Sequence, residues 1–257
     1  MDIYSLLQQT EKIRVSEGKA RKILESPGKN KVLVLVWSQL GDFDNLEYTW
    51  WLQREAAKLR AQDIEIKAIG IGDRNSGQKF CEYTGFPTEA LYVDPTAELH
   101  QKLALYPGLS LKLPFLNSKQ NAWCNFLLMC AGIGSPGTLQ EVFRGYTGDR
   151  KAPQLIQDNE TIKSFPLPAI KGELFAKAGG KGFQRPFELA TLRLRNMSEV
   201  LGNWNTYVPD ASYITQRGAT FLFDRTGKLL YEHHDRGILG FAKNPSNPLD
   251  FINSASV

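Results

Sequence analysis

The chain has 257 residues, of which 42% are apolar, and its formal net charge is +4. This length fits one large domain or two small ones with a packed core. No apolar run approaches the ~18 residues that a membrane-spanning helix needs. The basic residues form no run of Lys and Arg, which argues against a nucleic-acid-binding protein.

The first 30 residues predict an amphipathic helix. Apolar side chains recur near helical spacing from Ile3 to Leu24. The segment has Asp2 near its start and no cleavable apolar region, so it does not fit a secretion signal. We expect residues 1–30 to form a helical extension of a single domain that spans residues 1–257.

The next segments predict an α/β unit. Val32–Trp37 is a continuous apolar run, typical of a buried parallel strand. Ile64–Ile71 follows a helical pattern of about twenty residues, so the two runs have the spacing of a parallel crossover. Leu91–Val93 predicts a third, short strand.

Residues 107–205 break this pattern. They contain several helical periodicities and no convincing strand. They hold 12 basic and 7 acidic residues, an excess of +5, whereas the segments before and after them have net charges of −1 and 0. We predict a helical insertion that packs against the rest of the domain.

The stretch ATFLFDRTGKLLYEH predicts two strands joined by a turn at Asp224–Gly227. A parallel unit followed by an antiparallel hairpin is the order expected for a thioredoxin-like domain, with a larger doubly wound sheet as the alternative. We therefore predict an α/β thioredoxin-like fold, in which helices flank a central mixed sheet, with a large helical insertion.

The loop after the first buried strand reads Gly41-Asp42-Phe43-Asp44-Asn45. Asp44 and Glu47 have the spacing of a capping box with Asp in place of Ser or Thr. We expect Asp44 to accept a hydrogen bond from the Glu47 amide and Glu47 to reach back. We also consider an additional binding role for Asp42 in this loop.

Three stretches in this order resemble AhpC/TSA-type peroxiredoxin-like proteins, which have a thioredoxin fold. They are VLVLVWSQLGDFDNLEY, FCEYTGFPTEALYVDPTAELHQKL and RGATFLFDRTGKLLYEHHDRG. The middle segment, from LLMCAGIGSPGTLQEVFRGYTGDRKAP to GFQRPFELATLRLRN, resembles a subgroup associated with photosynthetic organisms. The resemblance extends from about residue 30 to residue 243.

This resemblance implies a redox loop that the chain lacks. Redox-active members carry Gly-Cys-x-x-Cys there, but Asp42 stands at the first cysteine position and Asn45 at the second. Peroxide reduction needs a sulfur that accepts oxygen and is later reduced, which a carboxylate cannot do. We therefore predict a redox-inactive protein that acts through binding, as an assembly or regulatory factor.

The cysteines keep a second hypothesis open, an atypical thiol-dependent peroxidase or oxidoreductase that uses Cys81, Cys124 or Cys130. Cys81 is the fallback among them. An odd count without a secretion signal favours a reducing, cytoplasmic compartment, and we expect three buried small side chains. The cluster Glu232–Asp235 contains two His, but adjacent strand residues point to opposite faces. Because a metal site needs three or four converging ligands, we expect neither a metal ion nor another cofactor.

We predict that residues 107–205 carry the function by contacting a protein partner or an anionic membrane surface. The alternative is that this insertion only covers one face of the sheet. A third hypothesis is a small ligand at Gly41–Asn45. The candidate binding residues are Gly41, Asp42, Phe43 and Asp44 in the loop, and Arg144, Arg150, Lys151, Lys177 and Lys181 in the insertion.

Overall fold

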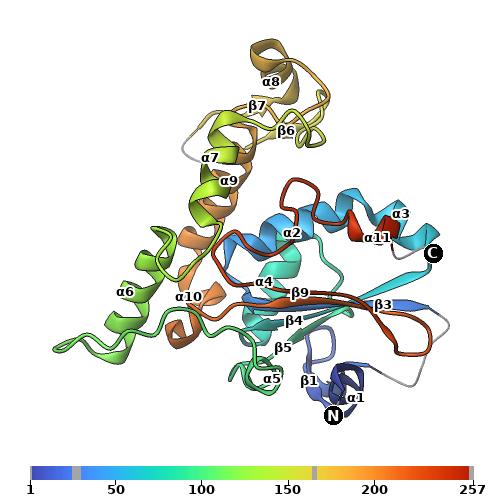
Figure 1. Ribbon diagram of the computed structural model, residues 1–257, viewed down its shortest axis with the longest axis vertical. Coiled ribbons are helices and arrows are strands. Elements are labelled where there is room, and N and C mark those ends of the chain that lie inside the picture. Colours follow the sequence, from blue (N-terminus) through green and yellow to red (C-terminus); the bar gives the residue numbers. More distant parts are fainter. Residues whose placement is uncertain (1, 25–29, 164–166, 255–257) are drawn as a thin grey trace.

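The computed structural model describes residues 2–24, 30–163 and 167–254 (Figure 1). The strands are β1 (Glu11–Arg14), β2 (Lys19–Lys22), β3 (Lys31–Gln39), β4 (Ile64–Ile71), β5 (Leu91–Val93), β6 (Thr161–Ile162), β7 (Ile170–Lys171), β8 (Ala219–Phe223) and β9 (Leu229–His234). The helices before residue 107 are α1 (Ile3–Gln9), α2 (Phe43–Arg54), α3 (Ala56–Ala61), α4 (Arg74–Thr84) and α5 (Glu98–Lys102). The later helices are α6 (Ser118–Cys130), α7 (Thr138–Thr147), α8 (Gly172–Gly179), α9 (Glu188–Gly202), α10 (Trp204–Tyr207) and α11 (Phe251–Ser254).

The central sheet has the strand order β2-β1-β5-β4-β3-β8-β9. Strand β3 pairs in parallel with β4, and β4 pairs in parallel with β5, whereas β8 runs antiparallel to β3 and to β9. The three predicted strands and the predicted hairpin are therefore confirmed. This mixed sheet, flanked by helices, is a thioredoxin-like fold.

Strand β3 is buried on both faces of the sheet, which explains its continuous apolar sequence. Side chains alternate along a strand, so Leu33 and Leu35 join the core that contains Trp51 of α2. Val34 joins the opposite core with Leu7 of α1. Figure 1 shows the same division, with α2, α3 and α4 on one side of the sheet and α1 and α5 on the other.

The predicted N-terminal helix is wrong for most of its length. Only α1 is helical, and β1 and β2 follow it as an antiparallel hairpin. Gly18, with φ +66°, lies in the turn between them. Ile13 of β1 pairs with Val93 of β5, so this hairpin extends the main sheet. Residues 1 and 25–29 of the predicted extension lie outside the described residues.

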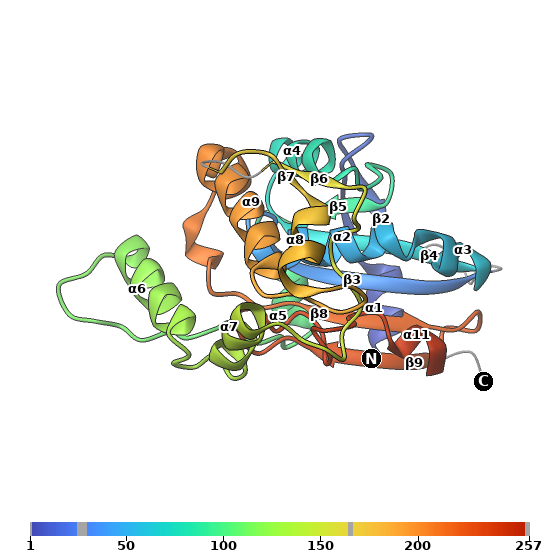
Figure 2. The same cartoon turned by 90° about the horizontal axis from the view of Figure 1, so that it is seen from above.

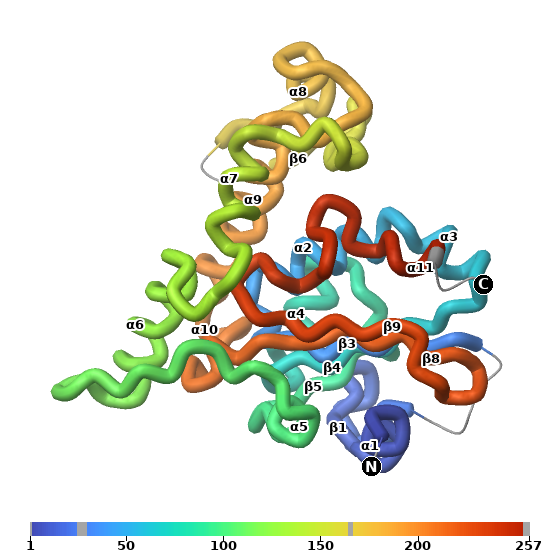
Figure 3. The backbone as a smooth tube through the Cα atoms, viewed as in Figure 1, coloured from blue at the N-terminus to red at the C-terminus, as the bar shows by residue number. Residues whose placement is uncertain are grey.

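The segment 107–205 contains α6 to α9, the start of α10 and the short pair β6 and β7; its residues 164–166 are not described. Figures 2 and 3 show that α6 lies apart from the sheet, while α9 runs beside α2. Arg193 of α9 joins this segment to the core, because its Nε lies 2.8 Å from Oε2 of Glu47 in α2. The helices in the described ranges lack the combined length and apolar character needed to cross a membrane.

Candidate functional site

The N-terminus of α2 is capped by Asp42. Its backbone is extended (φ −74°, ψ 130°), and its Oδ1 accepts a hydrogen bond from the Asp44 amide at 3.1 Å. Its other oxygen, Oδ2, accepts from Ser38 Oγ at 2.9 Å. Asp42 therefore has the geometry of an N-cap residue.

The predicted capping box of Asp44 and Glu47 is wrong. Asp44 lies inside the first turn of α2, and its Oδ2 accepts from the Leu239 amide at 2.7 Å. The Glu47 side chain is buried and pairs with Arg193. The carboxylates of Asp44 and Glu47 thus bind residues that are distant in sequence, and Asp42 caps the helix instead.

Arg217 lies at the centre of a buried ionic cluster with Asp42, Asp44 and Asp235. Its Nη2 is 2.6 Å from Oδ2 of Asp42. Its Nη1 is 3.8 Å from Oδ2 of Asp44 and 3.9 Å from Oδ2 of Asp235. The guanidinium is fully buried and Nε donates to the Thr215 carbonyl at 3.1 Å, so the cluster is part of the packed interior.

One guanidinium faces three carboxyl groups in this cluster, and burial penalises every ionised form. Burial and the neighbouring carboxylates of Asp42 and Asp235 raise the pKa of Asp44 well above its usual range. Burial also raises the pKa of Asp235 to about 6, although Arg217 opposes the shift. Burial alone lowers the pKa of Arg217, but its three carboxyl neighbours raise it above its ordinary value. At neutral pH the cluster therefore contains the permanent cation and at least one carboxyl group that is easily protonated.

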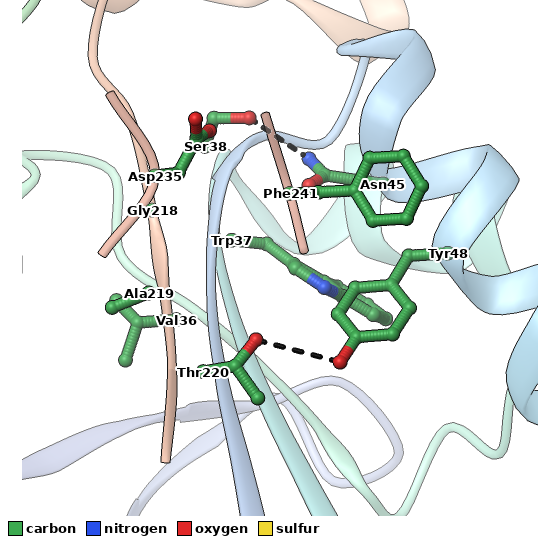
Figure 4. Close-up of a pocket in the computed structure, with 10 residues that line it drawn as sticks. All are labelled: Val36, Trp37, Ser38, Asn45, Tyr48, Gly218, Ala219, Thr220, Asp235 and Phe241. Atoms are coloured by element: carbon green, nitrogen blue, oxygen red, sulfur yellow. Dashed lines mark hydrogen bonds between the residues drawn. The ribbon is translucent and has the colours of Figure 1, made fainter. Parts of the chain in front are cut away.

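Asn45 is a structural residue. Its Nδ2 donates to the Gln39 carbonyl at 2.7 Å and to Ser38 Oγ at 3.2 Å. Figure 4 shows this bond to Ser38, with Asp235 also lining the adjoining cavity. The cavity is about 10 Å³, close to the room that one water molecule needs.

A larger pocket of about 220 Å³ opens beside the α2 N-terminus, where Asp42 and Phe43 line it. Most of the rest of its wall is apolar. It comes from α6 (Trp123, Phe126 and Cys130), α9 (Met197 and Leu201) and α10 (Trp204), and from Val208, Ile214, Ile238 and Leu239 later in the chain. The predicted loop residues are therefore brought together at one pocket. Gly41 also lines it, and its role is close packing, since a Cβ there would lie 2.7 Å from Cγ2 of Val208.

Two buried oxygens beside this pocket lack a hydrogen-bond partner among the described residues. They are Oε1 of Gln39 and Oδ1 of Asp44, and both residues line the pocket. A buried acceptor without a partner is unfavourable by about 1–3 kcal/mol. A ligand with an apolar body and a hydrogen-bond donor would match the apolar wall of this pocket and the two buried oxygens.

The cysteines differ from the expectation of three buried side chains. Cys81 is buried, Cys124 is half-buried and Cys130 is exposed on α6. Burial and two nearby glutamates raise the pKa of Cys81 to about 12. Partial desolvation, together with the Asp42 carboxylate, raises the pKa of Cys130 to about 11, although Arg217 opposes this. Neither thiol has the lowered pKa that marks a reactive thiolate.

The five predicted basic residues do not share one environment. Arg144 is half-buried, and its Nη2 pairs with Oε1 of Glu141 at 2.6 Å. Arg150 lies over the Phe183 ring at 5.1 Å, and Lys181 pairs with Asp158. Lys151 and Lys177 are exposed.

Sequence reasoning missed the main feature of the site, which is Arg217. The only local signal is its place two residues before the apolar run of β8, where a charged residue enters the interior and needs a partner. Within the described part of the chain, no three His, Cys, Asp or Glu side chains are grouped so that they could hold a metal ion.

Comparison with known proteins supplies the family. A search of curated proteins gives no match. The sequence model of the family described as AhpC/TSA antioxidant enzyme matches residues 51–237, well over half of the chain. The match begins within α2, after Asp42 and Asn45, and includes Arg217 and Asp235. The chain belongs to the AhpC/TSA antioxidant-enzyme family.

Proposed function

We propose that this protein is a member of its family without thiol peroxidase activity and that it acts by binding, as an assembly or regulatory factor. The buried cluster of Arg217 with Asp42, Asp44 and Asp235 carries this proposal. Asp42 occupies the place of a thiolate and pairs with the cation that would otherwise stabilise one. A carboxylate in that place cannot pass through the oxidation steps of a thiol.

The binding role is assigned to residues 107–205, with a protein or an anionic membrane as the partner. Of the 17 large apolar side chains that are exposed among the described residues, 15 lie between Leu111 and Leu201. Such a concentration is typical of an interaction surface. It supports a functional insertion over one that only covers the sheet.

The test measures peroxide consumption by the purified protein with dithiothreitol as reductant, using hydrogen peroxide and cumene hydroperoxide. We expect no turnover above the rate of dithiothreitol alone. The variants Cys81→Ser, Cys124→Ser and Cys130→Ser should match the wild type. Rapid turnover that one of these substitutions abolishes would refute the proposal.

One observation favours thiol peroxidase activity as the second candidate function. Cys130 lines the same pocket as Asp42 and Asp44. Its thiolate would attack one peroxide oxygen, forming an S–O bond as the O–O bond breaks and the alkoxide leaves with a proton. Two external thiols would then return the sulfenic acid to the thiol, releasing water and a disulfide. The raised pKa of Cys130 disfavours this candidate.

A further inference from the structure

The loop of residues 111–116, which leads into α6, presents its apolar side chains to solvent. Leu111, Leu113 and Leu116 are exposed, and Phe115 is 101% exposed. This loop and α6 form a projecting end of the molecule in Figures 1 and 2. A soluble surface rarely leaves so many neighbouring apolar side chains in water without a binding role.

Helix α6 holds the backbone of this loop in place. Asn125 bonds both backbone groups of Leu111, accepting from its amide at 3.1 Å and donating to its carbonyl at 2.9 Å. Asn121 accepts from the Leu113 amide at 2.8 Å and donates to the Leu116 carbonyl at 2.9 Å. The two asparagines thus satisfy the loop backbone from inside, and its apolar side chains are left facing outward.

The charged residues next to the loop in the sequence all have one sign. No Asp or Glu occurs from residue 99 to residue 140, whereas Lys112 and Lys119 are both exposed beside the apolar residues. Trp123 and Leu127 continue the exposed apolar surface along α6. Exposed Leu, Phe and Trp side chains next to lysines match the interface of a bilayer with anionic lipids.

We propose that the loop 111–116, with Lys112 and Lys119, docks this protein on an anionic lipid bilayer. The inference rests on the proposed function, because it names the partner of the same insertion. The uniform positive charge favours anionic lipid over a protein groove. A bilayer can accept apolar side chains at any point of its surface, so a projecting apolar loop can insert there. A protein partner would have to supply a pocket that matches the loop.

The experiment is flotation of the full chain with vesicles of phosphatidylcholine alone or mixed with phosphatidylserine, at low salt and at about 0.15 M salt. The wild type should bind the mixed vesicles, bind neutral vesicles more weakly, and bind less as salt rises. Leu113→Ser with Phe115→Ser should lower the partition coefficient about a hundredfold. Lys112→Gln with Lys119→Gln should lower it about 30-fold, and only on anionic vesicles.

Matched control variants come from two strands of the sheet outside the insertion. Leu229→Ser with Leu230→Ser removes two exposed leucines of β9, and Lys19→Gln with Lys22→Gln removes two exposed lysines of β2. Both pairs should bind like the wild type. Failure of the wild type to bind mixed vesicles would overturn the inference, as would an equal loss in the control pairs.

The outcomes separate this inference from the proposed function. Suppose that the wild type binds neither kind of vesicle, but that Leu113→Ser with Phe115→Ser abolishes binding of the chain to a protein partner. The lipid inference is then wrong, and the proposed binding function stands. If vesicle binding follows the loop as expected while the protein rapidly turns over peroxide through a cysteine, the docking surface stands and the proposed lack of peroxidase activity is wrong.

Discussion

Replacing Asp235 by Asn tests the electrostatics of the buried cluster. Asp235 is 5% exposed, and its Oδ2 lies 3.9 Å from Nη1 of Arg217. Its Oδ1 accepts from the Gly237 amide at 3.0 Å. Asparagine has the same size and retains an oxygen for that bond, so Asp235→Asn removes mainly the ionisable group.

The magnitude follows from the pKa of Asp235, which is about 6 in the folded protein against an ordinary value of 3.8. A shift of about two units corresponds to ~3 kcal/mol between the protonated and ionised forms. Because the folded pKa is raised, this stability is fully present below pH ~4 and is lost as pH rises through ~6. The free energy of unfolding of the variant, minus that of the wild type, should therefore rise by up to ~3 kcal/mol between pH 4 and pH 8.

The measurement is urea denaturation of both proteins across this pH range, with the difference in unfolding free energy as the readout. The comparison of the two proteins is needed because ionisation of His100 changes the unfolding free energy with pH in the direction opposite to that of Asp235. Burial lowers the pKa of His100 to about 4, so its contribution is lost as pH falls below about 6.5. That contribution is common to both proteins. A difference that stays constant from pH 4 to pH 8, at equal urea dependence, would refute the assigned ionisation of Asp235.

Three further predictions concern the same cluster. Arg217→Met should lower the free energy of unfolding by about 3–5 kcal/mol at pH 7, since three buried carboxyl groups lose their cation, and by less near pH 4; equal losses at both pH values would contradict this. Asp42→Ala should lower it by at least about 1 kcal/mol through the lost N-cap, and an unchanged denaturation midpoint would remove the capping argument. Asp42→Cys with Asn45→Cys should not create an efficient peroxidase, because the Asp44 and Asp235 carboxyl groups compete for the Arg217 guanidinium that would stabilise a thiolate there; rapid peroxide consumption would show that the site is otherwise intact.

The strands of the core were predictable because their signals are local. Ile64–Ile71 and Leu91–Val93 are found with the predicted bounds. Leu91–Val93 is a short apolar run, whereas Ile64–Ile71 alternates apolar residues with Glu65 and Lys67 before it becomes apolar from Ala68 onward, and both patterns indicate a strand. The hairpin of β8 and β9 was equally visible from its turn residues.

The N-terminal hairpin was not predictable in the same way. Strand β2 has the sequence KARK and is exposed along its whole length, so no apolar pattern marks it. Strand β1 is defined by its pairing with β5, which lies about eighty residues further along the chain. The apolar residues of this segment, which are spaced near a helical period, therefore predict one helix where the chain forms a helix and a hairpin.

The site shows a similar division between local and distant signals. The sequence predicts Asp44 as the cap of the helix that follows this loop, whereas the structure gives this role to Asp42. The choice between them depends on Arg217 and Leu239, which lie far away in sequence and engage the two carboxylates differently. A single arginine before an apolar strand gives no periodic pattern. The ionic cluster around Arg217 could therefore not be predicted from the sequence and is seen only in the structure.

The charge of the insertion illustrates why composition alone is a weak guide to a partner. The excess of +5 in residues 107–205 predicted a basic binding face. In the fold, Arg144, Arg185 and Arg193 all pair with buried glutamates, so these cations stabilise the insertion and its contact with α2. An ion pair with buried partners presents little field to a ligand, whereas an exposed side chain remains free to bind one. A surface is therefore better identified from the side chains that remain outside after internal pairs have formed, and in and beside the loop before α6 those are apolar residues together with Lys112 and Lys119.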